Sequence, residues 1–406
     1  MKRLLLTLLV LACYPSFAQE GDPNLLEIRK VYASDTDSDI TNAHDDWYRN
    51  YIFYNPDATP TDKIMLYIPG SIDNPLNTEK FPSLAANNGI PTISLVYEND
   101  DTGQDACGGS ADNNCHYKWR KEIIEGVDYS TEIAVDFDYS IENRFVRMLQ
   151  YLHTTYPTEG WDSYYGGDII NWTNIIVAGH SQGGSHAALI AKEHNVERAL
   201  CFASPNDYTN TNNSVADWTS INSATSDSNF YFFGNLYDEV PDGFAIQYEN
   251  MDSINAELYG DTVLVDNSNC PYSNSRLLYT KIDGGIGLVA NHNSPVRDSH
   301  TPVEIDGSAT YEPVWRYMLG LGCSTTGLED EEIDMISLYP NPATQQINFN
   351  SLRNENYQIF DSSGKVVSNG KVKVGLNEIE LDHLTNGFYF FKTTSNIEGI
   401  KFTIDK

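Results

Sequence analysis

One serine of this chain lies in a pattern that could carry nucleophilic chemistry, Gly-His-Ser-Gln-Gly at 179–183. A short β-branched run precedes the pattern and an alanine-rich segment follows it, so we expect a strand, a sharp turn and a helix. Such a turn holds the serine hydroxyl above the edge of a sheet, and glycines on either side avoid steric collisions. The pattern predicts that Ser181 is a nucleophile; the alternative is a glycine-rich turn whose serine only caps a helix.

A serine hydroxyl needs a base to accept its proton and an acid to orient that base. In proteins with a serine turn of this kind, the order along the chain is serine, then acid, then histidine. Asp238 is the predicted acid because it comes just after the strand-like run 230–233, and Asp207, one strand earlier, is the alternative. His292 and His300 are the candidate bases, since both lie between the last predicted strand and the closing helix.

The oxyanion formed during acyl transfer needs two backbone N–H donors. We expect one from Gln182, at the start of the helix after the serine, where the helix dipole also favours negative charge. The other is expected from Ser71, in the loop after the predicted strand 63–68, where Gly70 lets the backbone approach closely. This chemistry requires no metal ion and no organic cofactor.

Strands and helices alternate between residues 23 and 323, which predicts an α/β fold with a mostly parallel sheet covered on both faces. The strands are predicted at 63–68, 91–97, 174–178, 198–203, 230–234 and 277–282, and the helices at 81–88, 139–151, 185–194 and 311–319. An insertion with little periodicity lies between Glu98 and Ser140. Because it follows a strand end, its Tyr117 and Trp119 could line a substrate cleft; they could equally pack on the surface.

The first 18 residues are predicted to be a secretory signal peptide, because a basic start precedes an apolar run too short to span a bilayer and a small-residue cleavage site. Lipoprotein processing at Cys13 is the less favoured alternative. Export permits disulfides. The remaining cysteines are predicted to pair as Cys107 with Cys115, which flank a short loop, and as Cys270 with Cys323, leaving Cys201 as the free thiol.

Charge and hydropathy exclude two classes of partner. The chain has 57 acidic and 25 basic residues and a formal net charge of −32, so phosphates would be repelled and we expect no nucleic-acid partner. Beyond the signal peptide we expect no integral membrane segment and a soluble mature chain. Acidic runs at 35–39 and 99–105 could bind calcium, but their spacing differs from that of an EF-hand and solvated loops are favoured.

The C-terminal part of the chain has a different character. Residues 324–335 are polar and acidic, as in a linker, and 336–406 alternate in short runs that predict a small β-sandwich. Its motifs Leu-Tyr-Pro-Asn-Pro-Ala (338–343), Ile-Phe-Asp-Ser-Ser-Gly-Lys (359–365) and Leu-Thr-Asn-Gly-Phe-Tyr-Phe (384–390) resemble the C-terminal sorting domain of type IX secretion. The resemblance implies export by the type IX machinery to the outside or the surface of a Gram-negative cell; the alternative is a carbohydrate-binding β-sandwich.

Residues 19–323 resemble bacterial secreted or periplasmic α/β-hydrolases whose turn reads Gly-His-Ser-Gln-Gly-Gly. The other matching features are Tyr-Ile-Pro-Gly-Ser (67–71), Tyr-Ser-Ile-Glu-Asn-Arg (139–144), Trp172, Ser-Pro-Asn-Asp (204–207) and Pro-Val-Trp-Arg-Tyr-Met (313–318). The family's His-x-Ser-x-Val-x-Asp pattern matches 292–298, which favours His292 over His300 as the base. In one departure, Ser185 and His186 follow the glycines where most relatives carry a third small residue.

Together these observations predict a secreted serine hydrolase of the α/β-hydrolase fold. We expect Ser181, His292 and Asp238 to cleave a carboxylic ester, small or polymeric, through an acyl-enzyme. Esters are favoured over amides because no protease-like specificity element is visible. The alternative is a catalytically inactive α/β-hydrolase that serves as a binding module on the cell surface, since a fold alone does not establish activity.

Overall fold

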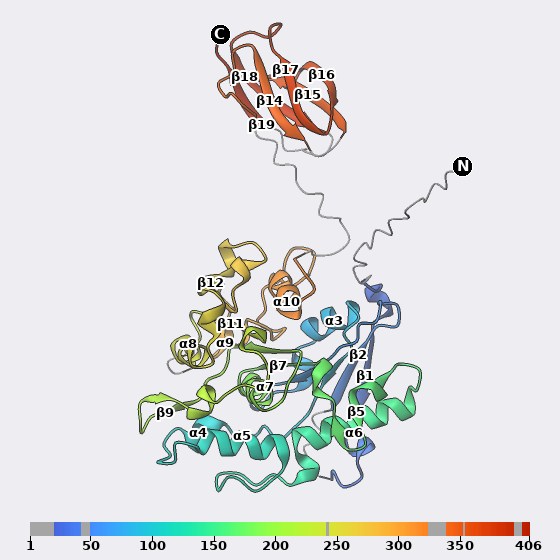
Figure 1. Ribbon diagram of the computed structural model, residues 1–406, viewed down its shortest axis with the longest axis vertical. Helices are drawn as coiled ribbons and strands as arrows, with labels where there is room; N and C mark the ends of the chain where they lie inside the picture. The colour runs from blue at the N-terminus through green and yellow to red at the C-terminus, as the bar shows by residue number, and fades with distance from the viewer. Residues whose placement is uncertain (1–19, 42–48, 241–242, 324–337, 352–353, 394–399) are drawn as a thin grey trace, which may run out of the picture. The chain divides into compact units, whose positions relative to one another are not determined.

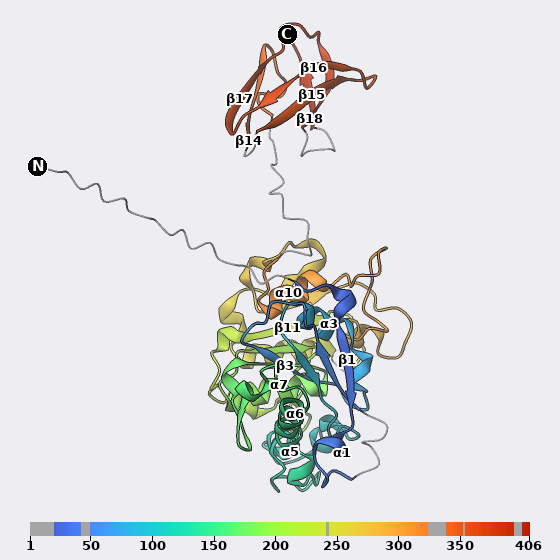
Figure 2. The same ribbon diagram turned by 90° about the vertical axis from the view of Figure 1, so that its right-hand side faces the viewer.

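The computed structural model describes residues 20–41, 49–240, 243–323, 338–351, 354–393 and 400–406 (Figures 1 and 2). The chain divides into two compact units, Met1–Thr325 and Thr326–Lys406. The signal peptide predicted at 1–18 and the linker predicted at 324–335 lie outside the described residues.

A nine-stranded sheet in the order β1-β2-β4-β3-β7-β8-β11-β13-β12 forms the centre of the first unit. Every neighbouring pair from β4 to β12 is parallel, whereas β1, β2 and β4 pair in antiparallel fashion. The strands are β1 (Glu27–Val31), β2 (Asn50–Tyr54), β3 (Ile64–Ile68), β4 (Thr92–Ser94), β7 (Ile175–His180), β8 (Arg198–Phe202), β11 (Phe230–Asn235), β12 (Val263–Leu264) and β13 (Leu277–Thr280).

Helices cover both faces of this sheet, which is why its central strands are apolar at almost every position. Successive residues of β3 point to opposite faces of the sheet. Leu66 packs with residues of α5, α6 and α7, and Met65 packs with residues of α3 and α10. Figure 1 shows α3 and α10 on one side of the sheet and α5 to α7 on the other. These helices are α3 (Lys80–Asn87), α5 (Cys115–Glu125), α6 (Ile141–Thr155), α7 (Gln182–Glu193) and α10 (Glu312–Leu319).

The predicted α/β architecture is therefore confirmed at the level of a mostly parallel sheet covered by helices. All six predicted strands belong to the sheet, although the one expected at 91–97 spans only Thr92–Ser94, and β1, β2 and β12 were not predicted. The helix expected at 185–194 begins earlier, at Gln182, directly after the serine.

The insertion between Glu98 and Ser140 is more regular than its sequence suggests, since it contains α4 (Gly103–Cys107) and α5. Trp119 of α5 is fully buried in the core, so it neither lines a cleft nor packs on the surface. Both predicted disulfides are present, Cys107–Cys115 between α4 and α5 and Cys270–Cys323 near the end of the unit, and Cys201 is a buried free thiol.

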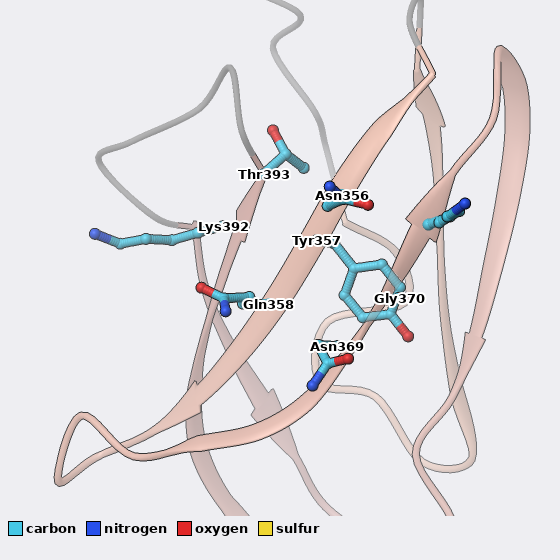
Figure 3. Close-up of a pocket in the computed structure, with 8 residues that line it drawn as sticks. Asn356, Tyr357, Gln358, Asn369, Gly370, Lys392 and Thr393 are labelled. Atoms are coloured by element: carbon cyan, nitrogen blue, oxygen red, sulfur yellow. The ribbon is translucent and has the colours of Figure 1, made fainter.

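The second unit is an antiparallel β-structure around its own apolar core. Its strands are β14 (Gln346–Ser351), β15 (Glu355–Asp361), β16 (Val366–Val372), β17 (Gly375–Glu380), β18 (Gly387–Thr393) and β19 (Ile400–Ile404), arranged as β14-β17 and β16-β15-β18-β19. An open groove of about 680 Å³ follows β15, β16 and β18, with Tyr357 beside Gly370 (Figure 3). The groove lining contains no acid, histidine, serine or cysteine, so the predicted chemistry must be sought in the first unit.

Candidate active site

Ser181 occupies the sharp turn between β7 and α7. Its backbone angles, φ 53° and ψ −120°, lie in a region that residues other than glycine rarely adopt, and such strain persists only where the surroundings enforce it. A Cβ on Gly179 would collide with Gly183, and a Cβ on Gly183 would collide with the backbone of Ile68 and Pro69. The two flanking glycines therefore allow the turn to pack directly against the loop after β3.

His292 and Asp238 are in direct contact, with 2.7 Å between Nδ1 of the imidazole and Oδ2 of the carboxylate. Asp238 lies in the loop after β11, and His292 in the short helix α9 (Ala290–Asn293). Both side chains are almost completely buried. The carboxylate also accepts hydrogen bonds from Nε2 of Gln247 (2.7 Å), in α8 (Gly243–Ser253), and from the backbone N–H of Val240 (2.9 Å).

These contacts decide which protonation states the pair adopts. Burial alone would raise the pKa of Asp238, but the hydrogen bonds from His292, Val240 and Gln247 outweigh it and hold the pKa below its ordinary value. An ionised carboxylate only accepts hydrogen bonds, so Nδ1 of His292 carries the proton and donates it to Asp238. In the neutral tautomer with this bond, the lone pair is on the other ring nitrogen, Nε2.

His180 connects this pair to the serine turn. Its Nε2–H donates to the backbone carbonyl of His292 (3.0 Å), and the two imidazole rings lie 5.0 Å apart. Burial lowers the pKa of His180 to about 3, so the ring stays neutral at physiological pH. Because His180 directly precedes Ser181, this bond places His292 beside the turn.

The Ser181 hydroxyl itself makes no hydrogen bond to any residue that the structure describes, His292 included. Contacts of this kind are often long before a substrate binds and shorten in the reactive complex.

Two further side chains hold the acid and histidine loops together. Glu239 accepts hydrogen bonds from the backbone N–H groups of Asn291 and His292, both at 3.0 Å. Asn235, at the end of β11, donates to the Ser294 hydroxyl (3.0 Å) and to the Ile282 carbonyl (2.8 Å). With Gln247, these are the site residues that we did not predict. In the sequence, only the short distance of Glu239 and Asn235 from Asp238, one and three residues, could have indicated these two.

The side chains of Ser71 and Gln182 contact each other beside Ser181. The Ser71 hydroxyl donates to Oε1 of Gln182 (2.8 Å). A Cβ on Gly70 would come within 3.3 Å of the Ser181 Cβ, which shows how closely this loop approaches the turn. The backbone N–H groups of Ser71 and Gln182 donate to no other residue within the described part of the chain. Both amides are thus available to bind an oxygen beside Ser181.

A pocket of about 660 Å³ opens at Ser181. Its apolar wall is formed by Val240, Ile246 and Val289, which come from the acid loop, α8 and the histidine loop. The remaining lining is mostly polar and comes from both sides of the serine: Ser71, Thr102, Gly103, Gln104, Asp105, Arg120, Gln182, Ser185, Asn206, Asp207, Tyr208, Asn210 and Gly243. The pocket is large enough for a small-molecule substrate.

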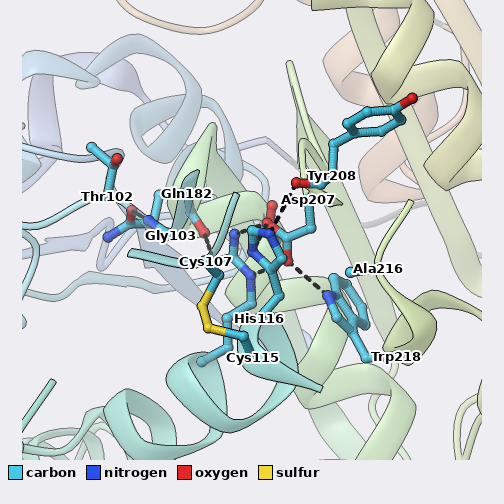
Figure 4. A network of polar contacts seen from close by, with 12 residues as sticks. Thr102, Gly103, Cys107, Cys115, His116, Gln182, Asp207, Tyr208, Ala216 and Trp218 are labelled. Carbon is cyan, nitrogen blue, oxygen red and sulfur yellow. Dashed lines mark hydrogen bonds and ion pairs between the residues drawn. A yellow bond between two sulfur atoms is a disulfide. The ribbon is translucent and has the colours of Figure 1, made fainter. Parts of the chain in front are cut away.

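Asp207, the alternative acid, forms its hydrogen bonds with residues other than His292. Its carboxylate accepts hydrogen bonds from Nε and Nη2 of Arg120 and from Nε1 of Trp218 (2.7 Å), and lies 3.4 Å from Nδ1 of His116 (Figure 4). Burial would raise the pKa of Asp207, but Arg120 and His116 hold it well below its usual range. Arg120 also donates to the Gln182 carbonyl (3.3 Å), so this buried network supports the start of α7.

The alternative base lies apart from the acid. Nδ1 of His300 contacts the Ser299 hydroxyl (2.7 Å), and no contact joins this ring to Asp238 or Ser181 in the part of the chain that the structure describes. The geometry thus brings together His292, Asp238 and the turn of Ser181, and leaves His300 and Asp207 outside that group.

The C-terminal unit matches a known family. The model of the secretion system C-terminal sorting domain matches residues 337–404. The predicted sorting domain is confirmed. A domain of this kind indicates a protein that is secreted or displayed on the cell surface by the type IX machinery. Among the described residues, no helix is long and apolar enough to cross a membrane, and no group of three or more His, Cys, Asp or Glu side chains could hold a metal ion.

Other comparisons add little about the first unit. No curated protein matches the chain. One match among solved structures is PorZ, an essential bacterial surface component of the type-IX secretion system of Porphyromonas gingivalis. The two are 18% identical over 21% of this chain and 13% of that chain, with a TM-score of 0.16. The chain therefore spans about an eighth of the length of that protein, and the likeness says nothing about the chemistry at Ser181.

Proposed function

We propose that the first unit is a serine hydrolase of the α/β-hydrolase fold that cleaves carboxylic esters. The observation that carries the proposal is the 2.7 Å contact between His292 and a buried, ionised Asp238, next to a serine held in a strained turn at the opening of a pocket. A surface carboxylate or a capping serine would need neither the burial nor the strain.

In the first half of the reaction Ser181 is acylated. Its Oγ attacks the ester carbonyl carbon while Nε2 of His292 accepts the hydroxyl proton, and Asp238 stabilises the imidazolium that results. The N–H groups of Gln182 and Ser71 bind the negative carbonyl oxygen, assisted by the positive end of the α7 dipole. The bond from the carbonyl carbon to the alcohol oxygen then breaks, and the imidazolium returns its proton to the leaving alkoxide.

The second half regenerates the serine. Water attacks the acyl-enzyme carbonyl, and Nε2 of His292 accepts a proton from that water. The bond to the Ser181 oxygen breaks, the serine recovers the proton, and the carboxylic acid leaves. His292 thus acts first as base and then as acid in each half, and Asp238 stays ionised throughout.

The test is active-site labelling and ester turnover by the full chain. We expect a fluorophosphonate probe to label the wild type, and Ser181→Ala to abolish labelling. Ser181→Ala and His292→Ala should lower kcat on p-nitrophenyl butyrate by about 10⁴-fold or more. The matched controls are Ser220→Ala and His153→Ala, since both residues lie outside the site and should leave kcat unchanged.

Each outcome has a clear reading. A folded wild type that neither reacts with the probe nor hydrolyses an ester would refute the proposal and favour a surface binding module. Loss of activity in Ser181→Ala but not in His292→Ala would transfer the role of the base to His300.

A further inference from the structure

The loop between β13 and α9 exposes large apolar side chains beside the pocket. Ile286 and Leu288 are fully exposed (103% and 96%), and Val289, which is 39% exposed, forms part of the apolar pocket wall. A single exposed apolar residue is common on protein surfaces, whereas several that gather beside a pocket indicate an interaction site. Their exposure to water is unfavourable, so a partner that covers these side chains would stabilise the protein.

This loop is held at its base by hydrogen bonds and exposes two apolar side chains at its tip. At the base, the Gly284 N–H donates to Oδ1 of Asn291 (2.8 Å), and Asn291 in turn donates to Glu239. At the tip, Gly285 has φ 93°, a conformation that glycine adopts without strain. The apolar side chains therefore project from a base that is bonded to the same elements as His292.

The tip lies close to the reacting serine. Val289 lines the pocket that contains Ser181, and consecutive Cα atoms are 3.8 Å apart, so Ile286 lies within about 11 Å of that wall. Ile72 is 66% exposed and directly follows Ser71, which also lines the pocket. We define these four residues, Ile72, Ile286, Leu288 and Val289, as the apolar rim.

The charge of the chain limits the kinds of partner that this rim could contact. Residues 284–290 carry no charge, whereas the whole chain has a formal net charge of −32. An anionic lipid surface would therefore be repelled at physiological salt. An uncharged apolar phase would cover the rim without that cost, and it would continue into the pocket along Val240, Ile246 and Val289.

We propose that the apolar rim docks the protein onto an uncharged, water-insoluble ester, with an acyl chain entering the pocket along the Val289 wall. This inference rests on the proposed esterase function. Burial of the rim in the ester phase places Ser181 at the interface, where the local concentration of ester bonds is far higher than in solution.

The experiment compares one ester in two states. The full chain is assayed on tributyrin below and above its solubility limit, and on soluble p-nitrophenyl butyrate. We expect the wild-type rate to rise at least tenfold once tributyrin forms an emulsion, and Ile286→Ser/Leu288→Ser to lose that rise. The double variant should keep kcat/KM on p-nitrophenyl butyrate within about twofold. The matched control, Ile169→Ser/Leu258→Ser, removes two other exposed apolar side chains (76% and 70%) and should behave like the wild type.

The outcomes separate this inference from the proposed function. No hydrolysis of either ester would refute the esterase itself. Hydrolysis of p-nitrophenyl butyrate without a rise on emulsified tributyrin, or with a rise that the double variant keeps, would overturn the docking role alone. An equal loss on both esters would place Ile286 and Leu288 in substrate binding rather than docking. A dimer that dissociates in the double variant would show that a second copy of the chain covers the rim, which also overturns the proposal.

Discussion

Asp207→Asn and Asp238→Asn should separate two buried carboxylates that look alike in the sequence. In the first variant the Arg120 guanidinium, with only 3% of its side chain exposed, loses the charge that balances it. Removing one partner of such a buried pair costs about 3–5 kcal/mol. For a unit of about 300 residues and an unfolding entropy of ~2.1 cal/mol/K per residue, this corresponds to a fall in Tm of roughly 5–8 °C.

The effects on kcat should differ between the two variants, with the larger loss in Asp238→Asn. Asp207 lines the pocket but has no hydrogen bond to Ser181 or His292, and its partner Arg120 reaches the serine turn through the hydrogen bond to the Gln182 carbonyl. Weakening that bond is worth about 1 kcal/mol, or roughly fivefold in kcat. Asp238→Asn replaces the carboxylate by a neutral amide that can donate to Nδ1 of His292 and favour the wrong tautomer, so kcat should fall by about 10⁴-fold.

Thermal unfolding and ester turnover of the two full-length variants provide the assay, with kcat corrected for the folded fraction. The reasoning is refuted if Asp207→Asn lowers kcat as much as Asp238→Asn does. It is equally refuted if Asp207→Asn leaves Tm unchanged, because Arg120 would then not depend on the charge of Asp207.

The same pair predicts an acid dependence of stability. The folded pKa of Asp207 lies well below its ordinary value of 3.8, so the unfolded state binds more protons in that range and stability falls as pH falls. The contribution is complete above about pH 5 and is lost below the unfolded pKa. The wild-type Tm should therefore drop more between pH 5 and pH 3 than the Tm of Asp207→Asn does.

Two further substitutions test the residues that position the pair. Gln247→Leu removes a donor to the Asp238 carboxylate, so we expect the pKa of Asp238 to rise and kcat to fall about tenfold. A wild-type kcat in this variant would contradict the positioning role of Gln247. His180→Phe keeps a ring but leaves the buried His292 carbonyl without its hydrogen-bond donor, at a cost of about 1–3 kcal/mol, so kcat should fall about tenfold. The control His153→Phe, in the last turn of α6, should have no effect on kcat. A wild-type kcat in His180→Phe would exclude His180 as a positioning residue.

Features that depend on neighbouring residues were predictable from the sequence. The turn of Ser181 needs only its two glycines, the strand before it and the helix after it, and all of these lie within one short segment. The pairing of Cys107 with Cys115 and the sorting domain are equally local, because a short loop or a set of spaced motifs suffices to indicate them.

Helix α5 was not predicted because its buried face is partly charged. It buries His116, Arg120 and Glu122 beside Trp119, so the apolar period that marks an amphipathic helix is absent. These side chains are tolerated in the interior only because the fold supplies partners: Asp207 for Arg120, and the backbone N–H groups of residues 129, 130 and 135 for Glu122.

The sequence favoured Asp238 over Asp207, but the contacts that set the two carboxylates apart appear only in the tertiary structure. Asp207 and Asp238 both follow strands that are neighbours in the sheet, so the sequence leaves Asp207 as the alternative to Asp238. Arg120 from α5 pairs with the first, while Gln247 from α8 and His292 from α9 contact the second. A carboxylate takes its role from the side chains that other elements bring to it, and that arrangement exists only once the chain has folded.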